Sequence, residues 1–375
     1  MVVSGIQESD GKYHVSGTVS GDDIDGIGFS DLVIDGDVTF RRCLIENADL
    51  TGVPHTVEFE DCKIAGIDIK DCDSEDSAIK SRVFHPKIVI RDCRVIGLKC
   101  LAEFGILRII DCRLEGKTDI SGSKFNNLNI IGTNCEYMKA TGITAKAVNL
   151  RLSRFVQLFD LLNSNFERIN MNETIVLETF RLPKITCEKD MFVLKLDNMT
   201  MNGRIILDLP GGYALQKEFV DKTARNNNSS GMAALRSALE SNRRFEAADL
   251  AFMEQKKKER DKNDSEYETN SVQRAISKIS YVFSGNGMRP SWTLGWMILI
   301  ILFFAIVYLI ADVRSGYNVG DLALIDAVYL SIVSFFVCDT FAVNTAGVWL
   351  MVAENIIGLL MMLYFTVILT RKLIR

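Results

Sequence analysis

A short motif recurs along residues 30–210 of this 375-residue chain. Apolar and polar residues alternate within each copy, which predicts short β-strands. The spacing is about 20 residues, with one step of about 30 at an insert near residues 73–86, and strands at such a fixed period indicate a solenoid. The four clearest copies are Val-Thr-Phe-Arg-Arg-Cys-Leu-Ile (38–45), Val-Glu-Phe-Glu-Asp-Cys-Lys-Ile (57–64), Ile-Val-Ile-Arg-Asp-Cys-Arg-Val (88–95) and Leu-Arg-Ile-Ile-Asp-Cys-Arg-Leu (107–114), and weaker copies follow at Leu128–Ile130, Val148–Leu152, Ile169–Met171 and Val193–Leu196.

We therefore expect residues 1–210 to form a β-solenoid, a right-handed β-helix of roughly nine coils. One coil cannot bury its own apolar face, whereas stacked coils bury a continuous core. At about 4.8 Å per coil, the stack would be on the order of 40 Å long. The segment Asn47-Ala-Asp-Leu50 shows the five-residue pattern of pentapeptide-repeat proteins, which this domain resembles in architecture.

The repeated cysteines, Cys43, Cys62, Cys93 and Cys112, are expected to stack inside successive coils, because a buried thiol behaves as a small apolar group. The alternative is a redox sensor, which would require thiols with a lowered pKa. Three aspartates directly precede them and are expected to cap the coil corners through side-chain to backbone bonds. These residues are Asp61, Asp92 and Asp111, and a cation-binding ladder is the alternative for them.

Composition excludes several classes of function. The formal net charge of −5 argues against nucleic acid as the main partner. The three histidines stand apart and no Cys-x-x-Cys pair occurs, so we expect neither a structural metal site nor a cofactor. We find no nucleophile–base set and no phosphate-cradling glycine loop, so an enzyme is not predicted.

Two apolar stretches follow the repeats. Trp292–Ala311 has about 20 residues, enough to cross a hydrocarbon core of roughly 30 Å, and Ala346–Thr370 is longer and carries one acid, Glu354. No hydrophobic signal segment opens the chain, so we expect the N-terminal part in the cytoplasm. Six basic residues flank the spans on their outer sides, against Arg314 alone between them, which places both termini inside. The six are Arg274, Lys278, Arg289, Arg371, Lys372 and Arg375.

The stretch between the spans predicts a re-entrant segment. Leu322–Phe336 is expected to form a short helix, with Asp321 near its N-terminus, where an acid suits the helix dipole. Residues 337–344 form a tight non-helical segment before the second span. Bare backbone within a membrane is tolerated only where protein or a water-filled cavity surrounds it. Residues 322–344 within a membrane domain of 291–375 are therefore expected to line a pore.

Residues 211–290 are expected to connect the two domains through a helical hairpin, Met232–Ser241 and Phe245–Lys258. Residues 211–231 show no periodicity and contain a turn-forming run. The charged run 255–262 is expected to be a solvated helix end; the alternative is a patch that binds anionic lipid. The hairpin sequence, together with Gly287, Arg289 and Pro290, resembles the linker of bacterial pentapeptide-repeat ion channels.

The membrane domain resembles the two-transmembrane potassium-channel pore family over about 85 residues, on its span–helix–span layout and its basic end. Glu354 and Gly358 match an acid-x-x-x-glycine stretch of the inner helix. The resemblance implies that Glu354 supports the pore and that Gly358 is the hinge of the inner helix. The alternative for Gly358 is a close helix crossing. A fourfold ring is also implied by the resemblance.

The segment at the position of the selectivity filter departs from that family. It reads Val337-Cys338-Asp339-Thr340-Phe341, so that Cys338 and Thr340 stand where the family has glycines. A positive φ at such residues costs about 1–2 kcal/mol each, which disfavours a ladder of carbonyls that coordinates potassium. We expect a ring of Asp339 carboxylates that attracts cations; the alternatives are a hydrogen bond behind the filter or a proton shared with Glu354. A soft-metal or oxidation-sensitive ring of Cys338 is a further alternative.

The sequence therefore predicts a homotetrameric ion channel, permeable to cations with weak potassium selectivity and carrying a cytoplasmic β-helical domain. It is expected in the cell inner membrane or plasma membrane, with two spans and contacts to membrane lipids. A cytoplasmic protein or a small-molecule ligand would gate it. The alternative is a non-conducting, membrane-tethered scaffold whose pore has decayed.

Overall fold

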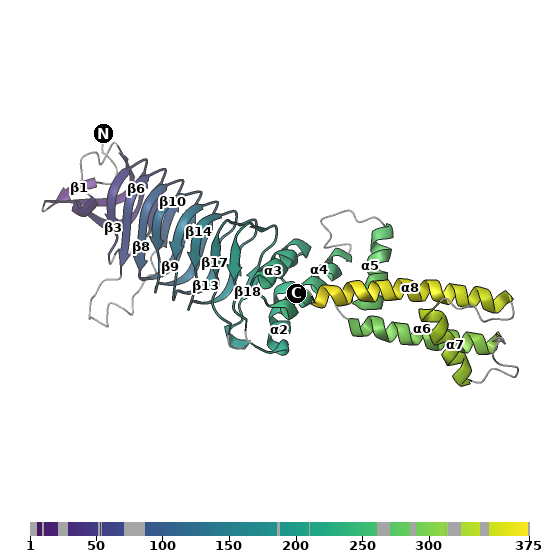
Figure 1. Cartoon of the computed structure of the whole chain (residues 1–375). Coiled ribbons are helices and arrows are strands. Elements are labelled where there is room, and N and C mark those ends of the chain that lie inside the picture. The colour runs from purple at the N-terminus through teal and green to yellow at the C-terminus, as the bar shows by residue number, and fades with distance from the viewer. Residues whose placement is uncertain are drawn as a thin grey trace. The chain divides into compact units, whose positions relative to one another are not determined.

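The structure, a computed structural model, describes most of the chain (Figure 1). It divides into two compact units, Met1–Lys258 and Glu259–Arg375. The first unit holds the strands and the helices α2–α4, and the second holds α5–α8. The described residues are 6–9, 11–21, 29–51, 53, 55–70, 87–185, 188–209, 211–260, 271–285, 290–311, 313, 324–337 and 345–373.

The repeats form a β-solenoid of about eight turns, as the row of parallel strands in Figure 1 shows. One sheet is built from β1 (Ile6–Ser9), β2 (Lys12–Ser20), β3 (Leu32–Arg41), β5 (Val57–Glu60), β7 (Lys87–Arg91), β9 (Glu103–Ile110), β11 (Lys124–Ile131), β13 (Thr144–Asn149), β15 (Asn165–Asn170) and β18 (Val193–Lys195). Neighbours in this sheet pair in parallel, except that β1 pairs antiparallel with β2. The antiparallel strands β1 and β2 therefore form a hairpin at one edge of this sheet.

Within each copy of the motif the chain turns a corner and passes from the first sheet to the second. It contains β4 (Leu44–Asp49), β6 (Lys63–Lys70), β8 (Arg94–Leu101), β10 (Arg113–Asp119), β12 (Asn134–Lys139), β14 (Arg154–Asp160), β16 (Ile175–Val176), β17 (Thr179–Arg181), β19 (Thr200–Met201) and β20 (Arg204–Ile206). The inward residues of both sheets join one continuous apolar core. The predicted solenoid is thus confirmed, and the strand after each cysteine belongs to a separate sheet.

Each corner between the sheets is a residue with a positive φ. At these corners the backbone N–H donates to a carbonyl of the next turn, as from Asp92 to Ile110. The structure has about eight turns, one fewer than the roughly nine that the sequence predicted. The eight corner residues are Arg42, Asp61, Asp92, Asp111, Gly132, Leu152, Glu173 and Asn198.

The three aspartates before the cysteines occupy these left-handed corners, with φ between 52° and 54°. Aspartate tolerates this conformation better than most residues. Within the described part of the chain their carboxylates accept no hydrogen bond, so the expected side-chain caps are not formed. Their backbone conformation therefore accounts for the recurrence of aspartate.

The residue after each corner forms a buried column, which confirms the predicted stacking of the cysteines. The amide of Cys43 donates to Sγ of Cys62 at 3.4 Å, and the amide of Cys62 donates to Sγ of Cys93 at 3.3 Å. The column continues through hydroxyl side chains at Thr133, Ser153 and Thr174, which donate to carbonyls of the preceding turn. The first four side chains of the column are thiols and the next three are hydroxyls, but both kinds donate to a carbonyl of the preceding turn.

Three helices close the far end of the solenoid, α2 (Tyr213–Ala224), α3 (Ser229–Ser241) and α4 (Phe245–Arg260). The side chain of Asn227 binds both the amide of Leu196 and the carbonyl of Leu194, at 2.6 Å each. The hydroxyl of Ser230 accepts from the amide of Asn198, the last corner. The absence of periodicity over 211–231 did not predict α2. These helices satisfy the polar backbone of the last turn.

The second unit consists of α5 (Ser271–Ser284), α6 (Pro290–Ile310), α7 (Leu324–Phe336) and α8 (Thr345–Leu373). In Figure 1, α6 and α8 run alongside each other, with the shorter α7 beside them. Small apolar clusters fill the space between them, one around Phe304 and Leu330 and the other around Met297 and Phe335. This arrangement agrees with the predicted order of span, short helix and span.

Candidate pore region

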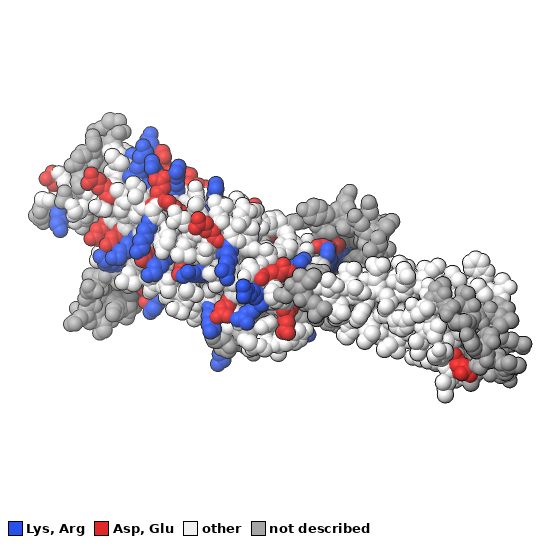
Figure 2. Space-filling view, in the orientation of Figure 1, with Lys and Arg blue, Asp and Glu red and all other residues white. Residues whose placement is uncertain are grey.

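Two helices of the second unit are long and apolar enough to cross a membrane. They cover Pro290–Ile310 and Gly347–Thr370. Large apolar side chains on both helices face outward, including Phe303, Ile310 and Trp349. Figure 2 shows that the face of α6–α8 in view carries almost no Lys or Arg, whereas the solenoid carries both signs of charge. Such surfaces require lipid or further protein around them.

The helix α7 is too short to span a membrane. It has 13 residues, which correspond to about 20 Å at the rise of an α-helix. It packs against both α6 and α8, and its end at Phe336 is followed directly by the predicted filter segment. The helix α7 thus lies against both long helices without the length to cross a membrane itself.

A buried carboxylate joins these three helices. Glu354 of α8 is fully buried. One of its oxygens accepts from the hydroxyl of Tyr308 on α6, and the other accepts from the hydroxyl of Ser331 on α7. A buried charge or acid requires such partners, because an unpaired carboxyl within an apolar environment is costly. The pair of bonds fixes the position of α7 relative to both spans.

The Ser331 hydroxyl is also 2.8 Å from the carbonyl oxygen of Ile301, so that it bridges α6 to Glu354. One turn further along, the side-chain amide of Asn355 donates to the carbonyl of Ser334 at 3.0 Å. The carbonyl groups near the C-terminus of a helix lack intrahelical partners. The bond from Asn355 satisfies one of these groups at the end of α7.

Gly358 lies where α8 meets the end of α7. A Cβ atom at this position would overlap the carbonyl oxygen of Phe335. The absence of a side chain therefore permits this approach, as glycine does at close helix crossings. This geometry favours the alternative reading of Gly358, whereas its role as a hinge stays a prediction.

Polar side chains also attach α5 to the end of α8. The hydroxyl of Tyr364 lies 2.6 Å from that of Ser284 and 2.9 Å from that of Ser280. The indole of Trp296 on α6 donates to the carbonyl of Val282 at 2.8 Å. These hydrogen bonds therefore link α5 to both long helices.

The structure describes three of the predicted site residues, Val337, Glu354 and Gly358. Val337 directly follows α7 and is exposed, and Glu354 and Gly358 lie at the junction of the helices. Cys338, Asp339, Thr340 and Phe341 lie outside the described residues, so the ring of Asp339 stays a prediction. Both oxygens of Glu354 already accept hydrogen bonds, which leaves less room for a proton shared with Asp339.

Sequence reasoning missed the two hydroxyl partners of Glu354. Tyr308 and Ser331 lie 46 and 23 residues from it along the chain. A single acid within an apolar span requires polar partners on neighbouring helices. That rule predicts that Glu354 has polar partners, but it does not say which hydroxyl side chains of α6 and α7 they are.

Comparison with known proteins finds no matching protein family, no matching curated protein and no matching solved structure. The class that the fold defines is a β-solenoid joined in one chain to two helices of membrane-spanning length.

Proposed function

We propose that the chain is one subunit of a cation-permeable channel, with a right-handed β-helix in the cytoplasm. The observation that carries the proposal is the position of α7, a short apolar helix held between two long ones by the buried Glu354. In this proposal four subunits surround one pore, the segment after Phe336 lines it, and Asp339 forms a carboxylate ring that attracts cations. Both termini lie in the cytoplasm.

The outward apolar faces of the second unit support an assembly in a membrane. The exposed side chains cover more than one side of the long helices, so that lipid and neighbouring subunits both find apolar surface. Two spans of one subunit cannot enclose a pore, and a ring of identical subunits closes by rotational symmetry. A ligand that bound the open and closed states differently would gate such a channel.

The proposal is tested by ion flux into vesicles that contain the purified full-length protein. We expect flux of small monovalent cations that depends on the protein and is reduced by Asp339→Ala. Cross-linking in the same vesicles should give products up to a tetramer. Vesicles that contain correctly inserted protein but show no flux under any voltage, tension or added ligand would contradict the proposal.

A membrane-tethered scaffold is the second candidate. It is favoured by one observation, namely that Cys338 and Thr340 stand where the resembling family has glycines. In this case the solenoid would bind a partner protein and the membrane helices would only anchor it. Flux that changes with Asp339→Ala would exclude this candidate.

A further inference from the structure

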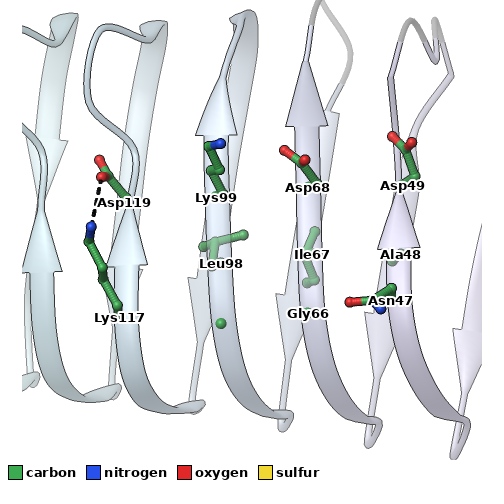
Figure 3. A pocket seen from close by; sticks show the side chains of 11 residues that line it. Asn47, Ala48, Asp49, Gly66, Ile67, Asp68, Leu98, Lys99, Lys117 and Asp119 are labelled. Carbon is green, nitrogen blue, oxygen red and sulfur yellow. Dashed lines mark ion pairs between the residues drawn. The ribbon is translucent and has the colours of Figure 1, made fainter.

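The second sheet of the solenoid carries a hollow on its outer surface, of about 540 Å³. This volume lies within the range of about 300–1,000 Å³ that is typical of small-molecule sites. The hollow crosses four successive strands, β4, β6, β8 and β10, as Figure 3 shows. Its location on the solenoid makes it independent of the proposed pore.

Glycines on neighbouring strands create the hollow. Gly66 pairs in register with Gly97, so that two adjacent turns lack a side chain at the same height. Asn47 pairs with Gly66 from the other side, and its side-chain oxygen lies over that glycine. Inward residues of the same strands belong to the core. The floor of the hollow is therefore backbone, and its walls are polar side chains.

The wall above the glycines is a row of charged side chains in register. Asp49 pairs with Asp68, Asp68 with Lys99, and Lys99 with Asp119. Lys117 lies beside Asp119, and the two form a 3.7 Å ion pair. Figure 3 shows Asp49 and Asp68 at one end of the hollow, and Lys99 and Lys117 with Asp119 at the other. One end therefore carries two carboxylates, and the other carries two lysines and one carboxylate.

Several of these groups have unused bonding capacity. Oδ2 of Asp68 forms a 2.8 Å ion pair with Lys70, whereas its Oδ1 is buried and has no hydrogen-bond partner among the described residues. Within the same part of the chain, no side chain forms an ion pair with Lys99, although Asp68 lies on the next strand. Buried polar atoms without partners are uncommon in folded proteins and call for an explanation. A ligand with donors at one end and acceptors at the other would supply these bonds.

Asp49, on the outermost strand of the hollow, is stabilised in its ionised form by hydrogen bonds. Asp49 accepts hydrogen bonds from the amide and the hydroxyl of Thr51, at 3.0 and 2.6 Å. The hydroxyl bond is the main cause of a pKa below the usual range for this carboxyl, and the amide and Lys70 add to it. Asp49 is therefore ionised at neutral pH and presents its second oxygen to a cation.

We infer that the hollow binds a short zwitterion of the size of a dipeptide, with its ammonium at Asp49 and Asp68 and its carboxylate at Lys99 and Lys117. Neighbouring strands lie about 4.8 Å apart, so the midpoint of the Asp49 and Asp68 pair is about 10 Å from that of the Lys99 and Lys117 pair. An extended dipeptide spans about 7 Å, and a hydrogen bond at each end covers the remaining distance. Asn47 both donates to and accepts from the peptide group.

The lining disfavours other ligands. None of the residues that line the hollow is aromatic, so there is no platform for a sugar ring or a quaternary ammonium. Among the described residues, no group of three His, Cys, Asp or Glu could hold a metal ion. Mixed charge at the two ends also fits a zwitterion better than a simple anion or cation.

The test is calorimetric titration of the full-length protein in detergent micelles with glycylglycine. We expect saturable binding with a dissociation constant on the order of 1 mM or tighter. N-acetyl-glycylglycine and glycylglycinamide each lack one charge and should bind about tenfold more weakly. Equal binding of the capped forms, binding of maltose in place of the dipeptide, or the absence of saturable binding by the dipeptide would overturn the inference.

Two pairs of variants locate the site. Gly97→Val fills the hollow without strain, because its Cβ would lie 3.5 Å from the nearest atom, and should abolish binding. Gly36→Val is the matched control, because Gly36 lies on β3 outside the hollow and its Cβ would lie 3.6 Å from the nearest atom, Cβ of Ser16 on β2. Lys99→Met should weaken binding about tenfold, whereas Lys139→Met, at the same register two strands along, should not. Wild-type affinity of Gly97→Val in a folded protein would overturn the location.

Discussion

At the residue scale, the position after each solenoid corner selects a small side chain that can both donate and accept a hydrogen bond. Cys112 donates to the carbonyl of Ile90, and Thr133, one turn later, donates to the carbonyl of Ile109. The amide of Cys112 in turn donates to the hydroxyl of Thr133. Thiol and hydroxyl are interchangeable here because the bonds, rather than the chemistry of sulfur, hold the turns together.

A substitution at Thr133 tests this interpretation. Thr133→Val keeps the shape but leaves the buried amide of Cys112 without an acceptor, which should cost about 1–3 kcal/mol of unfolding free energy. Thr133→Cys is the matched control and should retain most of the stability. The two variants are compared by urea unfolding of the solenoid in the full-length protein. Equal stability of both variants would show that the column is only apolar packing.

The chemical reactivity of the column follows from its burial. Hydrogen bonds with the thiols of Cys112 and Cys62, together with burial, raise the pKa of Cys93, and burial raises the pKa of Cys135 to about 12. A thiol whose pKa is raised stays protonated and unreactive at neutral pH. The pKa of Cys62 is instead lowered by its hydrogen bond with Cys43, and that of Cys112 by its hydrogen bond with Cys93. The packing interpretation therefore rests on the burial of these thiols, which keeps reagents and oxidants away from them.

We therefore expect native protein to resist iodoacetamide at the six cysteines that are buried in the described part of the chain, as measured by mass spectrometry of tryptic peptides. The same residues should react fully in urea. Alkylation of these sites in folded protein at the rate of a free thiol would instead support the redox alternative. The six are Cys43, Cys62, Cys93, Cys100, Cys112 and Cys135.

At the element scale, the sequence predicts the kinds of element well, because strand alternation and long apolar runs are local signals. The strands near Cys43 and Cys112, and the helices α6–α8, appear where the patterns place them. The helix α2 was missed because it is amphipathic only weakly and its packing partner, β18, is distant in sequence. The hydroxyl partners of Glu354 and the hollow were missed because both depend on tertiary register.

The crossing of α7 and α8 is tested by Gly358→Ala. Its Cβ would overlap the carbonyl oxygen of Phe335, which should cost about 1–3 kcal/mol of stability by overpacking. Gly295→Ala in α6 is the control, because no atom lies within 4 Å of its Cβ, and alanine there should be neutral or stabilising by up to about 1 kcal/mol. Thermal unfolding in detergent measures both.

The same pair of variants separates the two roles of Gly358. A close crossing predicts loss of stability in Gly358→Ala even when no ion flows. A hinge predicts wild-type stability with altered opening of the pore. A stable variant with changed flux would therefore contradict the packing role.

At the scale of the whole molecule, a polar solenoid and an apolar helical unit belong to different environments. The solenoid surface carries charges of both signs, whereas α6–α8 expose large apolar side chains. These surfaces are consistent with the proposed placement of the first unit in water and the second in a membrane. The basic residues that flank the two candidate spans predict both termini in the cytoplasm.

Protease protection of tagged protein in intact cells tests that orientation. Tags at either terminus should resist added protease until the cell membrane is permeabilised, and then both should be cleaved. A tag inserted after Asp312, between the two spans, should be cleaved in intact cells. Cleavage of either terminal tag in intact cells would contradict the predicted topology.

The most direct test of the central claim is the reversal potential of current through planar bilayers that contain the purified full-length protein. In a potassium chloride gradient, the account predicts a reversal potential displaced toward the cation equilibrium potential and moved toward zero by Asp339→Ala. A bilayer that contains folded tetramer but carries no current, or a current whose reversal potential ignores Asp339, would contradict it.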